Sequence, residues 1–197
     1  MDRRFLAAFT DPAPVRMLGR LVYPFCLKHR VRLEAIESPL ITGADVSVMD
    51  YYVAVLVCAE EPVGPPGIID RLRLMRLSSS FIKFHRELRK FRDFVMVDHW
   101  PKYWDKQVKS ESAAVGIPWP LGVVANLIAS GVPEQRAWEM PECQAVWLNT
   151  ALAARKGVDV NLLSTEEEDF MEEMRLASPP EVKTNEPHAG VSDQGQV

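Results

Sequence analysis

The side chains best suited to chemistry in this 197-residue chain are its cysteines and histidines, but their spacing matches no catalytic or metal-binding pattern. The cysteines are Cys26, Cys58 and Cys143, and the histidines are His29, His85, His99 and His188. Cys26 and His29 form the only local pair, three residues apart on a predicted helix. Because a third ligand is lacking, we interpret them as a core cysteine beside a surface histidine. The sequence predicts no catalytic residue, no metal and no cofactor.

The surroundings of the cysteines indicate a reducing compartment. Each cysteine lies among apolar neighbours, which favours buried thiols over disulfides. The longest uncharged stretch, residues 112–133, is interrupted by three prolines, and no apolar run of signal-peptide length follows the first residues. We therefore expect a cytoplasmic protein with no membrane partner.

Charge is distributed unevenly along the chain. The net charge is -4, yet residues 159–197 contain ten acidic and two basic residues, so the preceding residues carry +4. Eight basic residues alternate with phenylalanines in one segment: Arg71, Arg73, Arg76, Lys83, Arg86, Arg89, Lys90 and Arg92. Cations beside aromatic rings suit nucleic acid, which is one interpretation of this segment. The others are a solvated helix face, or a docking surface for an acidic partner or for the chain's own acidic end.

The periodicity of apolar residues predicts an all-α fold, a compact bundle of six to eight helices. We expect helices over residues 25–37, 47–59, 68–97, 121–130, 133–139, 141–156 and 164–176. Ser47 with Asp50 resembles a capping box, and the helix that it starts is expected to be the most buried. We divide the chain into a loose N-terminal lead (1–14), a helical domain (15–176) and a disordered acidic tail (177–197).

The segment from 68 to 97 has a clear apolar stripe, although the three serines at 78–80 mark a bend or a second helix start. Its members recur at three- and four-residue steps: Leu72, Met75, Leu77, Phe81, Phe84, Leu88, Phe91 and Val95. We interpret this stripe as the face that packs in the core.

Five tryptophans are many for a chain of this size, and aromatic anchors gather at interfaces as well as in cores. Trp119, between two prolines, is the one expected at a surface rim. Combined with the basic face, this pattern predicts a set of partner-contact residues: Trp119, Trp138, Met140, Phe84 and Arg89.

Two segments resemble small proteins from the tail modules of tailed phages and prophages, the tail assembly chaperones. The first begins with the run from Leu21 to Arg30, with its Pro-Phe and helical histidine, and continues through Ser38-Pro39 into the second helix. The second joins Pro118-Trp119, the Trp138-Glu139-Met140-Pro141 turn and the acidic helix start after Thr165.

This resemblance implies a non-enzymatic helper in the bacterial host cytoplasm. It would bind the phage tape measure protein, and keep it soluble until tail-tube protein polymerises around it. Three alternatives remain open: a nucleic-acid-binding protein that uses the basic 71–92 face, a structural virion connector, and an enzyme built on His29 and His99.

Overall fold

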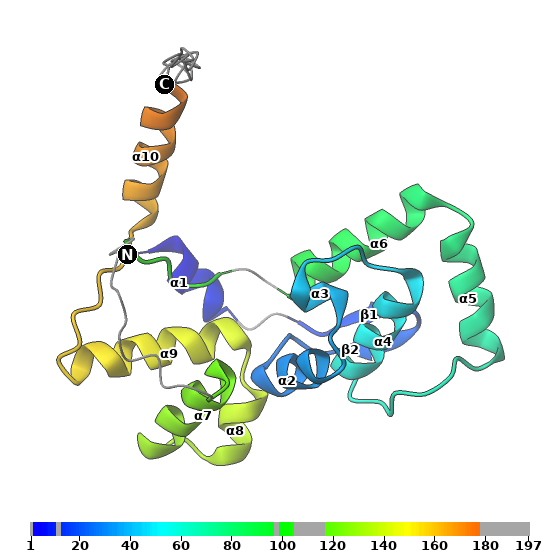
Figure 1. Ribbon diagram of the computed structural model, residues 1–197, viewed down its shortest axis with the longest axis horizontal. Coiled ribbons are helices and arrows are strands. Elements are labelled where there is room, and N and C mark those ends of the chain that lie inside the picture. The colour runs from blue at the N-terminus through cyan, green and yellow to red at the C-terminus, as the bar shows by residue number, and fades with distance from the viewer. Residues whose placement is uncertain (1, 11–12, 97–98, 105–116, 178–197) are drawn as a thin grey trace, which may run out of the picture. The chain divides into compact units, whose positions relative to one another are not determined.

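The computed structural model describes residues 2–10, 13–96, 99–104 and 117–177, and this part of the chain is mostly helical, as predicted (Figure 1). It contains ten helices and one two-stranded sheet. The chain divides into two units, Met1–Thr165 and Glu166–Val197. The second includes most of α10 (Thr165–Ala177), and the predicted tail beyond it lies outside the described residues. No described helix has the length and hydropathy needed to cross a bilayer.

The N-terminal segment is helical where we expected a loose lead. Helix α1 (Arg3–Ala8) is capped by the side chain of Asp2. Phe5 packs edge-on against Trp147 of α9 (Glu142–Arg155), with ring centroids 5.5 Å apart. This aromatic contact buries one side of a helix that is too short to be stable alone.

The beginning and the end of the first unit are joined by polar contacts. The guanidinium of Arg4 donates a hydrogen bond to the carbonyl of Leu163. The hydroxyl of Thr165 donates to the carboxylate of Asp2 over 3.2 Å. Residues separated by some 160 positions in sequence therefore meet at one place.

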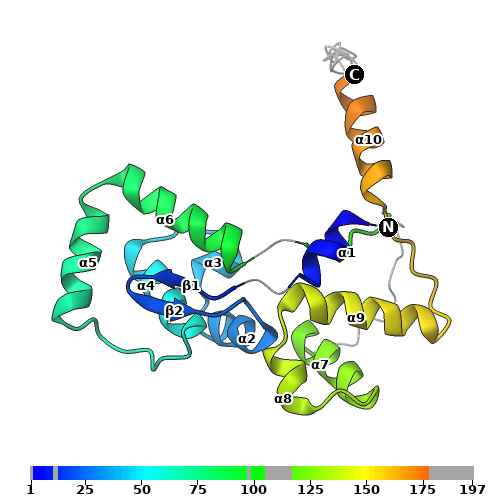
Figure 2. The same ribbon diagram turned by 180° about the vertical axis from the view of Figure 1, so that it is seen from behind.

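A β-hairpin follows α1. Strands β1 (Val15–Met17) and β2 (Arg20–Val22) pair antiparallel and lie against α4 and α6, as seen from behind in Figure 2. The two-residue turn has positive φ at Leu18 (48°) and Gly19 (77°), as in the turns that match the twist of a hairpin. A side chain at Gly19 would collide with the guanidinium of Arg73, so this turn also seats α5.

Three helices follow the hairpin: α2 (Leu27–Ala35), α3 (Pro39–Thr42) and α4 (Val48–Cys58). Helix α2 starts later than predicted because Cys26 is extended and forms a β-bridge to Pro141. The capping box at the start of α4 is confirmed by the structure. Helix α4 is buried along most of its length, also as predicted.

The long predicted helix is two helices, α5 (Ile68–Ser78) and α6 (Phe81–Phe94), and Ser80 caps the second. Only the α6 half of the predicted stripe forms core. Phe84 and Phe91 pack edge-on against Tyr51 of α4, with ring centroids 6.1 and 5.8 Å apart. The prediction of burial is wrong for Leu72 and Met75, which are exposed because the break turns α5 away from the α6 register. It is also wrong for Phe81, which is exposed in the first turn of α6.

A second core forms around α7 (Trp119–Ala129), α8 (Glu134–Glu139) and α9. Each of these helices starts just after a proline, whose fixed φ suits that position. The core residues of α7 to α9 gather around Leu27 of α2. All three cysteines are buried and free of disulfides, as predicted.

Candidate partner-binding surface

Six large apolar side chains form an exposed surface on α5 and the first turn of α6. Each is between 62% and 81% exposed. The four on α5 occupy positions i, i+1, i+4 and i+7, which is one face of a helix. We call this set the α5 surface: Ile68, Ile69, Leu72, Met75, Phe81 and Ile82.

Helix α5 is fixed to the fold by its opposite face. Leu74 is buried against Tyr52 and Leu56 of α4. Arg20 of the hairpin forms a bidentate pair with Asp70, with nitrogen–oxygen distances of 2.7 and 2.8 Å. This pairing holds the pKa of Asp70 below its usual value. The α5 surface is thus presented by a helix anchored through both apolar and ionic contacts.

The surroundings of the α5 surface are strongly basic. Residues 68–94 include eight basic and three acidic residues, a net charge of +5. By helical periodicity, Arg71 borders the apolar stripe and Arg76 lies within it near Ile69, and both are exposed. An apolar stripe flanked by cations is complementary to an amphipathic helix with acidic flanks.

The five contact residues predicted from the sequence are not gathered on one surface. Phe84 and Met140 are buried in the two cores, so they support surfaces rather than form them. Arg89 is exposed on α6 and lines a hollow of about 780 Å³ with Phe84. Trp138 is half-buried and lines a separate hollow.

Trp119, expected at a rim, is 40% exposed but already has an intramolecular partner. Its ring lies 4.9 Å from the guanidinium carbon of Arg30, and Trp100 lies at 5.7 Å from the same carbon. Arg30 also pairs with Glu142, with Nε 2.6 Å from the carboxylate oxygen. These contacts join α2 to α7 and α9.

The sequence contains a signal for the α5 surface that the predicted apolar stripe did not include. Six of the eleven residues of α5 are large and apolar, more than one helix face can hold. Leu74 and Leu77 occupy one side, whereas Ile68, Ile69 and Leu72 occupy the other. An excess of apolar residues around a helix therefore marks a second apolar face.

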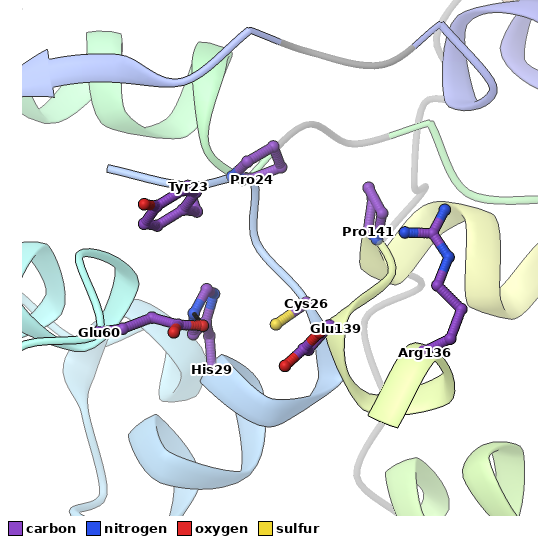
Figure 3. Close-up of a pocket in the computed structure, with 8 residues that line it drawn as sticks. All are labelled: Tyr23, Pro24, Cys26, His29, Glu60, Arg136, Glu139 and Pro141. Atoms are coloured by element: carbon purple, nitrogen blue, oxygen red, sulfur yellow. Dashed lines mark ion pairs between the residues drawn. The ribbon is translucent and has the colours of Figure 1, made fainter. Parts of the chain in front are cut away.

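A polar pocket of about 510 Å³ lies at the start of α2 (Figure 3). His29 lines it together with Glu60 on one side and Arg136 on the other. The surface position predicted for His29 is wrong: its side chain is only 1% exposed, and its ring lies near the Phe25 ring and the Glu60 carboxylate. Neither ring nitrogen has a hydrogen-bond partner within the described residues, and Nε2 is 3.7 Å from a Glu60 oxygen.

The electrostatics of this pocket oppose nucleophilic catalysis by Cys26. Burial lowers the pKa of His29 to about 4, so the imidazole is neutral near pH 7. Burial also raises the pKa of the Cys26 thiol, whereas a reactive cysteine needs the thiolate. His99 is not among the lining residues. In the part of the chain that the structure describes, no three His, Cys, Asp or Glu side chains gather to hold a metal ion.

Comparison of the chain with protein-family models, curated proteins and solved structures gives no significant match. A function for this protein is therefore inferred from the surfaces of the chain itself.

Proposed function

We propose that this protein is a non-enzymatic binding protein that captures an amphipathic helix of a partner on the α5 surface. The observation that carries the proposal is the cluster of six apolar side chains, each more than 60% exposed, on the anchored helix α5 and the first turn of α6. Contiguous exposed apolar surface of this kind marks interaction sites in folded proteins. The flanking arginines favour a partner helix with acidic residues beside its apolar stripe.

The proposed partner is the tape measure protein of a phage tail, and the proposed place is the bacterial cytoplasm. The resemblance to tail assembly chaperones motivates both. A long helical protein offers many amphipathic segments, and covering their apolar faces would keep it soluble. The helical fold and the α5 surface are compatible with this role.

Nucleic-acid binding is the second candidate, and the basic residues of α5 and α6 favour it. The exposed centre of the surface opposes it, because five of its six side chains are aliphatic and bases stack on aromatic rings. Phe81, the one aromatic member, already stacks on His85 with ring centroids 3.8 Å apart. An amphipathic partner helix therefore fits this aliphatic surface better than nucleic-acid bases do.

Substitution in the α5 surface tests the proposal. The DNA flanking the gene is sequenced first, because a tape measure gene there would supply the partner. Labelled helical segments of that partner are then titrated with the wild type, with Leu72→Glu and with Ile36→Glu. Ile36 is an exposed apolar residue at the end of α2, outside the α5 surface, and serves as the matched control.

We expect Leu72→Glu to weaken binding by roughly 10–100-fold, the effect of losing one buried leucine, and Ile36→Glu to leave it unchanged. Equal binding by all three proteins would exclude the α5 surface. Binding of DNA or RNA that weakens steeply with salt would instead support the nucleic-acid alternative. Presence of the protein in purified phage particles would favour a connector over a chaperone.

A further inference from the structure

Helix α10 is acidic and has an exposed apolar stripe. Phe170, Met171 and Met174 are 62%, 47% and 55% exposed. They occupy positions i, i+1 and i+4, the same spacing as Ile68, Ile69 and Leu72 on α5. The helix contains six acidic residues and one basic residue, a net charge of -5.

The α5 surface and α10 are complementary in charge, pattern and length. The segment that contains the α5 surface carries +5, equal and opposite to α10. Helices of 11 and 13 residues are about 16 and 20 Å long, so α10 can cover α5 from end to end. By helical periodicity, Glu166 and Glu173 lie on one side of the α10 stripe, whereas Arg71 borders the α5 stripe and Arg76 lies within it.

We propose that α10 of one copy of the protein binds the α5 surface of a second copy. A second copy is the better occupant because the segment between α9 and α10 is tied to the first unit: the Leu163 carbonyl accepts from Arg4, and the Leu163 amide donates to the Lys102 carbonyl. The first residue of the helix, Thr165, is held by Asp2 next to α1, and α1 packs on α9. Helix α5 packs on α4 and α6. A second copy brings its α10 to α5 without this restraint.

Each copy has one α5 surface and one α10, so two reciprocal contacts close a dimer. Self-association requires no other partner and does not depend on the proposed function. If the proposed function is correct, α10 covers the α5 surface until a partner helix replaces it. The free protein would then avoid exposing two apolar stripes.

Charge reversal on the two helices in separate full-length chains tests this proposal. The first variant is Arg71→Glu with Arg76→Glu, and the second is Glu166→Arg with Glu173→Arg. In either variant alone, the substituted residues meet residues of like charge in both α5–α10 contacts. In a dimer that contains one copy of each variant, one α5–α10 contact joins the two substituted helices, whose charges are opposite but exchanged. The other contact joins the two native helices.

The mass in solution is measured by sedimentation equilibrium over a wide range of protein concentration at low salt, and circular dichroism checks that each variant folds. We expect the wild type to dimerise and each variant alone to dimerise at least about ten-fold more weakly. The mixture should regain dimerisation. The control Ile36→Glu should behave as the wild type.

Three results would overturn the proposal: a wild type that is monomeric at every concentration, variants that dimerise as well as the wild type, and a mixture that stays monomeric. The last result is expected if α10 binds α5 of its own chain. Because no other partner is present, these outcomes are independent of whether the proposed partner binds.

Discussion

His29 and Arg30 are neighbours on α2, but the fold treats their side chains in opposite ways. The His29 ring is buried without a hydrogen bond, and burial keeps it neutral. The Arg30 guanidinium lies beside the Glu142 carboxylate and the rings of Trp100 and Trp119. The difference follows from direction: one side chain enters a polar pocket, and the other reaches the α7 and α9 helices.

Burial of His29 predicts a specific pH dependence of stability. The unfolded chain binds a proton at this residue near pH 6.5, whereas the folded chain binds it only near pH 4. The free energy of unfolding therefore has its full value above pH 6.5, and it falls by roughly 2–3 kcal/mol as the pH decreases to 4. Urea denaturation between pH 7 and 5 should show this decrease.

The variant His29→Gln provides the control for this pH dependence. The window above pH 5 avoids Glu60, whose pKa is lowered by a hydrogen bond from Lys28. In that window the free energy of unfolding of His29→Gln should depend less on pH than that of the wild type. Parallel pH profiles for the two proteins would contradict the assignment.

At the scale of elements, the starts of the helices were easier to predict than which of their faces are buried. Ser47, Ser80 and the prolines before α7, α8 and α9 are local signals that act within one helical turn, and the sequence shows them directly. Which face of α5 is covered depends on α4 and on Arg20, which are distant in sequence. The α5 surface was missed for this reason.

The capping box of α4 predicts a measurable loss when its hydroxyl is removed. Ser47 accepts a hydrogen bond from the Asp50 amide over 3.2 Å, and Asp50 accepts one from the Ser47 amide over 2.9 Å. Ser47→Ala should lower the free energy of unfolding by about 1 kcal/mol. Ser78→Ala, at the exposed end of α5, should change it by less than about 0.5 kcal/mol, since that hydroxyl only bonds a carbonyl of its own helix.

The ion pair between Arg20 and Asp70 predicts local loosening of α5. Arg20 also contacts Glu61 at 2.7 Å, so Arg20→Ala removes two hydrogen bonds to α5 and one to the loop that precedes it. We expect amide exchange in α5 to accelerate by about ten-fold or more, while α9 exchanges as before. Equal acceleration in both helices would indicate global destabilisation instead.

At the scale of the whole molecule, the all-α class could be predicted because it follows from apolar periodicity summed over many residues. The hairpin and α1 were missed because three- and six-residue elements contain too few periods to be recognised. The candidate site could be predicted only in part. Its basic residues are apparent in the sequence, but the exposure of Leu72 and Met75 follows from tertiary packing. Three of the predicted contact residues, Phe84, Trp138 and Met140, pack in the cores.

The pair of Arg30 and Glu142 joins parts of the first unit that have separate cores. Arg30→Met removes a cation that lies 2.6 Å from the Glu142 carboxylate, which is only 9% exposed. We expect a loss of about 3 kcal/mol in the free energy of unfolding, and Arg30→Met with Glu142→Leu should recover most of it. Thermal or urea denaturation of the four proteins gives the coupling energy, and additive losses would exclude the pairing.

The contacts of Asp2 with Thr165 and of Arg4 with Leu163 bring the two ends of the first unit together. In topological terms, that unit is nearly a closed ring, because its two ends lie side by side. A peptide link between these ends would add little strain, and the exposed stretch from Glu60 to Gly64 offers an alternative place to cut. The order in which its helices are synthesised is therefore not dictated by its packing, and the same architecture is open to circular permutation.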